Sequence, residues 1–349
     1  MNTGIPIKDR NEEIYHHIDA GFINKRLCFS VFGQSFSEIF NERKIEETDH
    51  WGVLSNTHLF VDLAIAYCKQ NNVQSLGIIL SDLKKGSIFC STETCEGTDD
   101  DLYEAKRVKN RILLPYYHEK RVILNFGTEH FVADTGRVEQ EDKNLISLIG
   151  LIRDITDTEV IVQPLIMGAP LLNHPKNSHI NDQLLWWCRW EMFEIFPEEI
   201  DQFSQIKNCP DPEIEEWQDY MKKTSENDIK LKLTSLFNDT TKKDWGGEMN
   251  DHFSTSLTIE KKRYNTAFLL KGPANFREMT LDMCGKRANQ IVRLSKSPAN
   301  LLVVQHCHNV SEDVRETLKK FAVTPSSPRK YCIIDGKDTY KILKCYNLL

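Results

Sequence analysis

The chain has 349 residues, a formal net charge of −7 at pH 7 and 27% charged residues, a composition typical of a globular protein. The negative net charge argues against binding of nucleic acid over the whole surface. No apolar run reaches the roughly 18 residues that a membrane-spanning helix needs, and the polar start lacks a signal-peptide core. We therefore predict a cytoplasmic protein that does not bind membranes.

The ten cysteines have no paired spacing. In the cytoplasm such a set favours reduced, mostly buried thiols over a disulfide framework. A chain of this length also favours two domains, each with its own core. The proline-containing break at 208–212 separates a predicted N-terminal domain, residues 1–205, from a predicted C-terminal domain, residues 213–349.

The N-terminal domain is predicted to be of the α/β class, with helices and strands that alternate along the chain. Helices are predicted at 12–18, 35–47, 57–69, 102–117 and 144–155, and strands at 27–32, 73–80, 87–90, 122–126 and 158–167. No glycine-rich phosphate loop or nucleophile elbow occurs in this half. The residues do not reveal what this half recognises; a sensor role, for a protein or ligand trigger, is implied only by the family that the other half resembles.

The C-terminal domain is predicted to begin with a helix at 226–239 and to continue with a β-hairpin. The run HFSTSLTI, residues 252–259, alternates in polarity as a half-buried strand does. A charged turn follows, and YNTAFLLK, residues 264–271, returns and stops at Gly272-Pro273. The ends of an antiparallel pair lie side by side, so Asp251 and Lys271 are expected to meet.

A carboxylate beside a lysine suits metal-assisted hydrolysis of a phosphodiester. The carboxylate would hold Mg²⁺ or Mn²⁺, which polarises the phosphate and acidifies a bound water. The lysine would stabilise charge that develops during attack. Asp251 and Lys271 are accordingly the predicted metal ligand and catalytic cation.

The elements that follow the hairpin extend this pattern. A helix carries Gln290, LLVVQH is predicted as a strand, and the chain ends in YCIIDGKDTYKIL. Together with Asp251 and Lys271, this order resembles the PD-(D/E)XK nuclease superfamily, most closely its Mrr-type restriction endonuclease branch. The resemblance covers only the C-terminal third of the chain. It implies a mixed sheet flanked by helices, a Mg²⁺-dependent endonuclease acting on DNA, a role in antiviral defence or restriction, and a place for Gln290 beside the catalytic lysine.

One position departs from the pattern of that family. The residue two before the lysine, usually Glu or Gln, is Leu269 here. It shares a strand face with Lys271, so a metal ligand is missing from its usual place. Glu248 is the nearest replacement, and Glu226 or Asp228 on the preceding helix could also reach the site.

Between 260 and 296 basic residues outnumber acidic ones, as a groove that follows a phosphate backbone requires. Lys286, Arg287 and Arg293 are predicted to face outward and to contact nucleic acid. RNA is an alternative to DNA as the substrate, and cutting both strands of a duplex would favour a homodimer. The alternative function is a catalytically inactive nuclease fold that binds nucleic acid or a protein partner.

Overall fold

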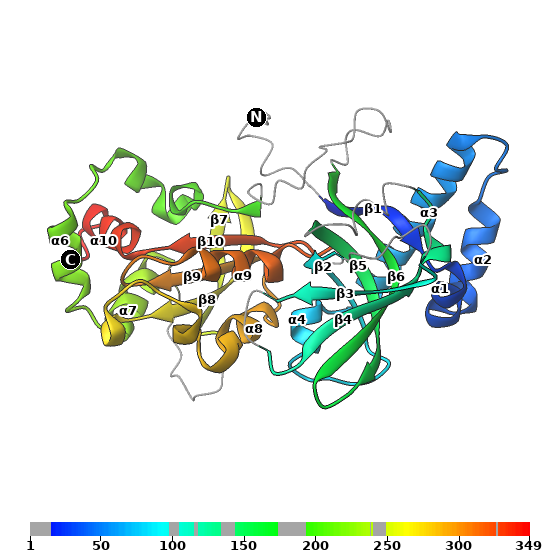
Figure 1. The fold of residues 1–349 in the computed structure, drawn as a ribbon. Helices are drawn as coiled ribbons and strands as arrows, with labels where there is room; N and C mark the ends of the chain where they lie inside the picture. Colours follow the sequence, from blue (N-terminus) through cyan, green and yellow to red (C-terminus); the bar gives the residue numbers. More distant parts are fainter. Residues whose placement is uncertain are drawn as a thin grey trace. The chain divides into compact units, whose positions relative to one another are not determined.

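The computed structural model describes residues 15–97, 105–114, 118–133, 144–173, 193–237, 239, 249–325 and 327–349. Two compact units are formed (Figure 1): unit 1 is Met1–Arg189 with Val323–Pro328, and unit 2 is Trp190–Ala322 with Arg329–Leu349. Both helices and mixed sheets occur, which confirms the predicted α/β class. In the described part of the chain, no helix has the length and apolar character needed to cross a membrane.

Unit 1 is built on a six-stranded sheet with the order β1-β6-β4-β3-β2-β5, in which β5 also pairs with β6. Five strands therefore close into a ring of pairings, all antiparallel except β4 with β6. The strands are β1 Tyr15–Ile23, β2 Ile88–Glu96, β3 Arg107–Leu113, β4 Arg121–Gly127, β5 Asn144–Ile155 and β6 Glu159–Asn173. The helices are α1 Lys25–Phe32, α2 Gln34–Arg43, α3 His50–Gln70 and α4 Leu76–Ile79.

Several local predictions for unit 1 are wrong. The predicted helices at 102–117 and 144–155 contain β3 and β5, and the predicted helix at 12–18 overlaps β1. Strand β5 is buried on both faces over much of its length, so its continuous apolar run lacks the period of two that identifies a strand.

The opposite error occurs at 27–32 and 73–80, which were predicted as strands and contain α1 and α4. Valine and phenylalanine in the first segment favour strands, but Asn24 caps a helix there: its side chain accepts the backbone N–H of Leu27 at 3.0 Å. The helix at 57–69 and the strands at 87–90, 122–126 and 158–167 are confirmed by α3, β2, β4 and β6.

Unit 2 contains a four-stranded mixed sheet with the order β10-β9-β8-β7. The β7–β8 hairpin is antiparallel, whereas β8, β9 and β10 run parallel, as the predicted mixed sheet required. The strands are β7 His252–Ile259, β8 Lys262–Lys271, β9 Leu301–His306 and β10 Lys330–Ile334. The α-helices are α6 Ile214–Met221, α7 Glu226–Leu236, α8 Asn289–Ser295, α9 Glu312–Ala322 and α10 Gly336–Cys345.

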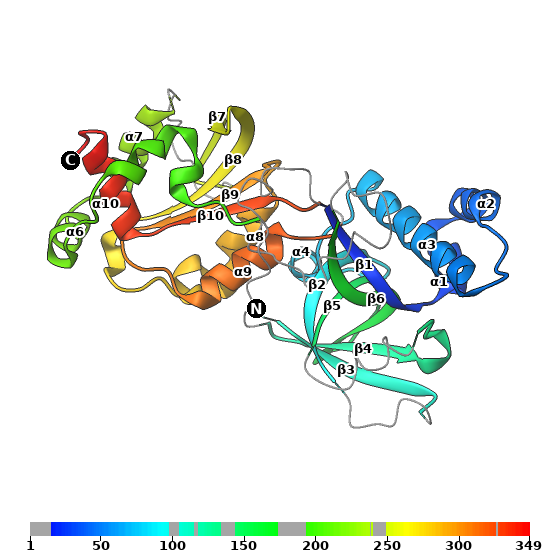
Figure 2. The same ribbon diagram turned by 90° about the horizontal axis from the view of Figure 1, so that it is seen from above.

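The sheet of unit 2 is covered by helices on both faces (Figure 2). Phe268 and Leu270 of β8 belong to one core with α6, α7 and α10. The intervening residue Leu269 points to the other face, which α8 and α9 cover. Lys271 shares the face of Leu269, so its side chain leaves the sheet on the side of α8.

The segment before α6 is part of the core of unit 2. A 3₁₀ helix, η5 Asp201–Asn208, places Phe203 and Ile206 in the core that contains Phe268. This packing explains why the division between the units falls at residue 190, before the predicted boundary at 205–213.

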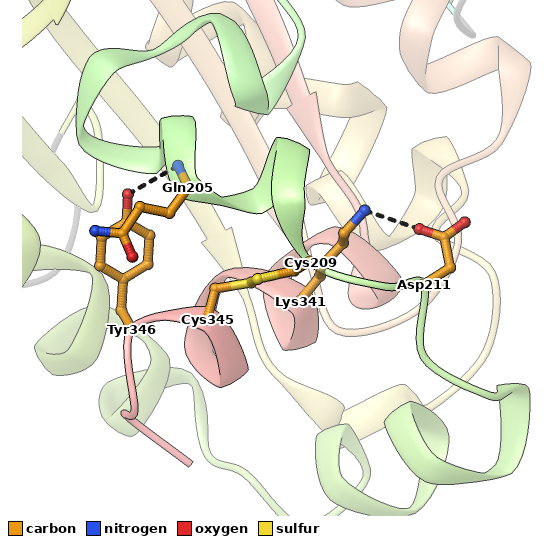
Figure 3. Close-up of a disulfide and its surroundings, with 6 residues drawn as sticks. All are labelled: Gln205, Cys209, Asp211, Lys341, Cys345 and Tyr346. Carbon is orange, nitrogen blue, oxygen red and sulfur yellow. Dashed lines mark hydrogen bonds and ion pairs between the residues drawn. A yellow bond between two sulfur atoms is a disulfide. The ribbon is translucent and has the colours of Figure 1, made fainter.

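A disulfide joins this segment to the last helix (Figure 3). Cys209 follows η5 and is bonded to Cys345, the final residue of α10. Two contacts support the same junction: Lys341 donates to Asp211 at 2.8 Å, and the Gln205 backbone N–H donates to the Tyr346 hydroxyl at 3.3 Å. The expectation of reduced thiols is thus wrong for this pair. It holds for seven free, buried cysteines of the described residues, namely Cys28, Cys68, Cys90, Cys95, Cys284, Cys307 and Cys332.

The disulfide spans 136 positions of sequence, so it constrains much of the unfolded chain of unit 2. Reduction is expected to lower the free energy of unfolding by about 2–4 kcal/mol. Urea unfolding with and without dithiothreitol measures the effect. The double variant Cys209→Ser/Cys345→Ser should unfold at the same urea concentration as the reduced protein, and dithiothreitol should not change its midpoint. An unchanged unfolding midpoint in the reduced wild type would contradict the assigned bond.

Candidate functional site

The start of the hairpin is held by the Asp251 side chain. The backbone N–H of Asp251 donates to the Phe268 carbonyl at 2.9 Å, and its Oδ2 accepts the backbone N–H of Leu270 at 2.7 Å. Strand β7 begins only at His252, so this carboxylate continues the ladder by taking the place of a backbone carbonyl. Asp251 is thereby fixed one residue from Lys271.

A second carboxylate approaches the same strand from α7. Ser225 caps this helix by accepting the backbone N–H of Asp228, which places Glu226 at the first helical position. Oε2 of Glu226 accepts the backbone N–H of Gly272 at 3.1 Å. A Cβ at Gly272 would lie 2.7 Å from the Glu226 backbone nitrogen, so only glycine permits this approach.

Lys271 lies between the two amides that these carboxylates hold. In a strand, the N–H groups of residues two apart point to the same edge, roughly 6–7 Å from one another. The N–H groups of Leu270 and Gly272 therefore face the edge where β7 has ended. The structure brings the Asp251 and Glu226 carboxylates to the backbone on either side of Lys271, whose own side chain leaves the sheet towards α8. All three residues remain at least partly exposed to solvent.

The charge of Lys271 acts on two further groups, His306 and Cys284. Burial lowers the pKa of His306 to about 4, and the Lys271 ammonium contributes to the lowering. Burial raises the pKa of Cys284 to about 12, while Lys271 opposes that shift. His306 is fully buried opposite Lys271 in the β8–β9 register and accepts the His308 backbone N–H at Nδ1. A neutral imidazole and a neutral thiol thus border the lysine.

Gln290 lies on α8, which packs against β8 on the face that carries Lys271. Its Oε1 atom is buried and has no hydrogen-bond partner among the described residues. A buried acceptor normally has one, so this oxygen is suited to a group that the protein chain itself does not provide. Helix α8 begins only one residue before Gln290, and two 3₁₀ turns, η7 Leu281–Cys284 and η8 Lys286–Ala288, precede it.

The donor set fits Mg²⁺ or Mn²⁺ in part. Asp251, Glu226 and the Gln290 Oε1 atom offer the hard oxygens that these ions prefer. Leu269, at 3% exposure, supplies no ligand. Within the described ranges no group of three or more His, Cys, Asp or Glu residues is arranged to hold a metal ion. Glu248, the other candidate ligand, lies outside the described residues.

The predicted basic residues differ in how they are presented. Lys286 is exposed, whereas Arg293 is half-buried with its Nε atom inaccessible to solvent. The side chain of Arg287 lies outside the described part. The basic residues of the hairpin turn, around Lys262, are at the opposite end of β8 from Lys271, about 30 Å away by strand length. The basic stretch of sequence is therefore divided between two places.

Comparison of the chain with protein-family models, with curated proteins and with solved structures gave no match in any of the three.

The stability of Asp251 variants measures the structural role of this side chain apart from any chemical role. Asp251→Ala leaves the Leu270 N–H without its acceptor and should lower the free energy of unfolding by about 1–3 kcal/mol. Asp251→Asn retains an amide oxygen at that position and should lower it less. Urea unfolding of both variants compares the two costs. Equal stability of the alanine and asparagine variants would show that this bond does not secure the hairpin.

The lowered pKa of His306 predicts a pH dependence. The unfolded chain takes up a proton near pH 6.5, whereas folded His306 does so only near pH 4. This group therefore contributes stability that is present above pH 6.5 and is lost as the pH falls towards 4. Nitrogen-15 chemical shifts of the imidazole should stay those of the neutral ring down to pH 5. Protonation with a midpoint between 6 and 7 would overturn the assignment.

Proposed function

We propose that unit 2 is a metal-dependent endonuclease domain that hydrolyses phosphodiester bonds of DNA. The observation that carries the proposal is the placement of the Asp251 and Glu226 carboxylates on either side of Lys271, at the carboxyl end of β8. The strand order and the resemblance of the C-terminal third to the PD-(D/E)XK superfamily support it.

Each residue has a distinct role in this proposal. Asp251 and Glu226, with the Gln290 Oε1 atom, would hold Mg²⁺ or Mn²⁺, which when bound polarises the scissile phosphate and acidifies a water. The Lys271 ammonium would offset negative charge on the phosphate oxygens as water attacks. Exposed Lys286 would contact the backbone of the nucleic acid as a point charge.

The proposed reaction also suggests an oligomeric state and a role for unit 1. Cutting both strands of a duplex requires two such sites, which favours a homodimer on DNA. Unit 1 would then respond to a protein or ligand trigger, in a cytoplasmic defence or restriction effector. RNA is the alternative substrate, because the residues around Lys271 would act on the phosphodiester group, which DNA and RNA share.

Leu269 supports a second candidate function. It is apolar and buried where this superfamily usually places an acidic or amide ligand. A chain with that replacement could retain the fold and the lysine while binding nucleic acid or a protein partner without cutting. The two candidates differ in whether cleavage depends on Asp251 and Lys271.

The test is cleavage of supercoiled plasmid, and of labelled single-stranded DNA and RNA, by the full-length protein with Mg²⁺ or Mn²⁺. Lys271→Met and Asp251→Asn should each reduce the rate by at least about 100-fold, since each removes a charge that acts on the reacting phosphate. Chelation with EDTA should abolish cleavage.

The matched control is Lys262→Met, which removes an exposed lysine from the far end of the same strand. It should cut at the wild-type rate. Cleavage that survives both site substitutions would place the activity elsewhere or in a contaminant. Binding of nucleic acid without metal-dependent cleavage would favour the second candidate.

A further inference from the structure

A cavity of about 400 Å³ lies in unit 2, at the carboxyl ends of β9 and β10. Asn309 and Val310 come from the loop after β9, and Ile333 and Asp335 from the end of β10. In sheets with parallel strands, ligands bind at such carboxyl ends. The size falls within the usual range for small organic ligands and far exceeds that of a metal ion.

Four carboxylates line this cavity: Glu194, Glu278, Asp335 and Asp338. One of them is neutralised within the wall, because Glu194 is 8% exposed and forms an ion pair with Arg315. The other three come from separate positions and give the cavity an excess of negative charge. Apolar side chains, including Phe196 and Ile333, complete the lining.

Asp335 and Asp338 lie together at the start of α10. The backbone N–H of Asp338 donates to the Asp335 side chain at 2.8 Å, and the Asp335 backbone N–H in turn acts on the Asp338 carboxyl and lowers its pKa. Burial, with the neighbouring Asp335 and Glu198 carboxylates, raises the pKa of Asp338 to about 7. Lys337 has a smaller, opposing effect, since its ammonium donates to Asp211 at 2.7 Å.

We propose that this cavity is a binding site for a small organic cation, a protonated aliphatic amine or a guanidinium. Glu278, Asp335 and Asp338 provide the charge, and the apolar side chains accept an alkyl chain. The group comes either from a free molecule such as a polyamine or from the Lys or Arg side chain of a peptide. The site lies at β9 and β10 and does not rest on the nuclease proposal.

Binding is coupled to a proton. A cation beside Asp338 stabilises the ionised carboxylate, so binding near neutral pH releases a proton from a group that is partly protonated. Affinity should rise up to about tenfold from pH 6 to pH 8, the range over which a group with a pKa of about 7 ionises. The Asp335 and Glu198 carboxylates raise the pKa of Asp338, while the Asp335 backbone N–H and the Lys337 ammonium lower it. Glu194 and Arg315, which also line the cavity, form an ion pair with each other.

The experiment is isothermal titration of the full-length protein with spermidine, with agmatine and with acetyl-Gly-Arg-Gly-amide. Glutarate, an anion, is the control ligand. At pH 7, buffers of different ionisation enthalpy measure the released proton. Binding by the free amines alone assigns the site to a small molecule, and tighter binding of the peptide assigns it to a side chain.

Glu278→Gln changes an exposed lining residue, and Glu215→Gln changes an exposed carboxylate of α6 outside the cavity. Glu278→Gln should weaken binding at least fivefold and Glu215→Gln should leave it unchanged. Asp338→Asn should remove the proton release and the pH dependence. Absence of binding by all three cations at millimolar concentration, or equal affinity in the two glutamine variants, would overturn the proposal.

Discussion

The last residues of β8 impose the constraint on which the site depends. β7 begins at His252, opposite Phe268, whereas β8 continues to Lys271. The backbone N–H groups after Phe268 that point towards β7 therefore have no β7 carbonyl to bond to. Each unpaired N–H in a half-buried place costs about 1–3 kcal/mol. Asp251 and Glu226 satisfy two of these groups. The need for acceptors therefore brings two carboxylates to the lysine and ties α7 to the end of the hairpin.

The same bonds determine what those carboxylates can do. A carboxylate offers about four lone-pair positions, so a bond from one oxygen to a backbone N–H does not exhaust its capacity to bind a cation. The bond does fix the orientation of the side chain, which a metal ligand requires. In the proposed nuclease, structural and chemical roles would therefore coincide at Asp251, and loss of activity in an alanine variant would not distinguish them.

The sequence predicted unit 2 better than unit 1 for a physical reason. The hairpin is half-buried at its start and ends at Gly272-Pro273, so both its period and its limits are visible locally. β5 is buried on both faces and α1 is rich in residues that favour strands, so local patterns misled there. The contact of Glu226 with Gly272 could not be predicted, since it depends on how α7 packs rather than on either segment alone.

The carboxyl edge of the unit 2 sheet carries charges of opposite kind. β8, β9 and β10 are parallel, so Lys271 and the acidic cavity at β10 both lie at this edge, about 10 Å apart by strand spacing. That separation is close to the screening length at physiological salt, about 8 Å. A phosphate backbone placed at β8 would still experience repulsion from Asp335 and Asp338. A cation in the cavity would remove that repulsion, so occupancy there would favour nucleic acid at Lys271 without any change of conformation.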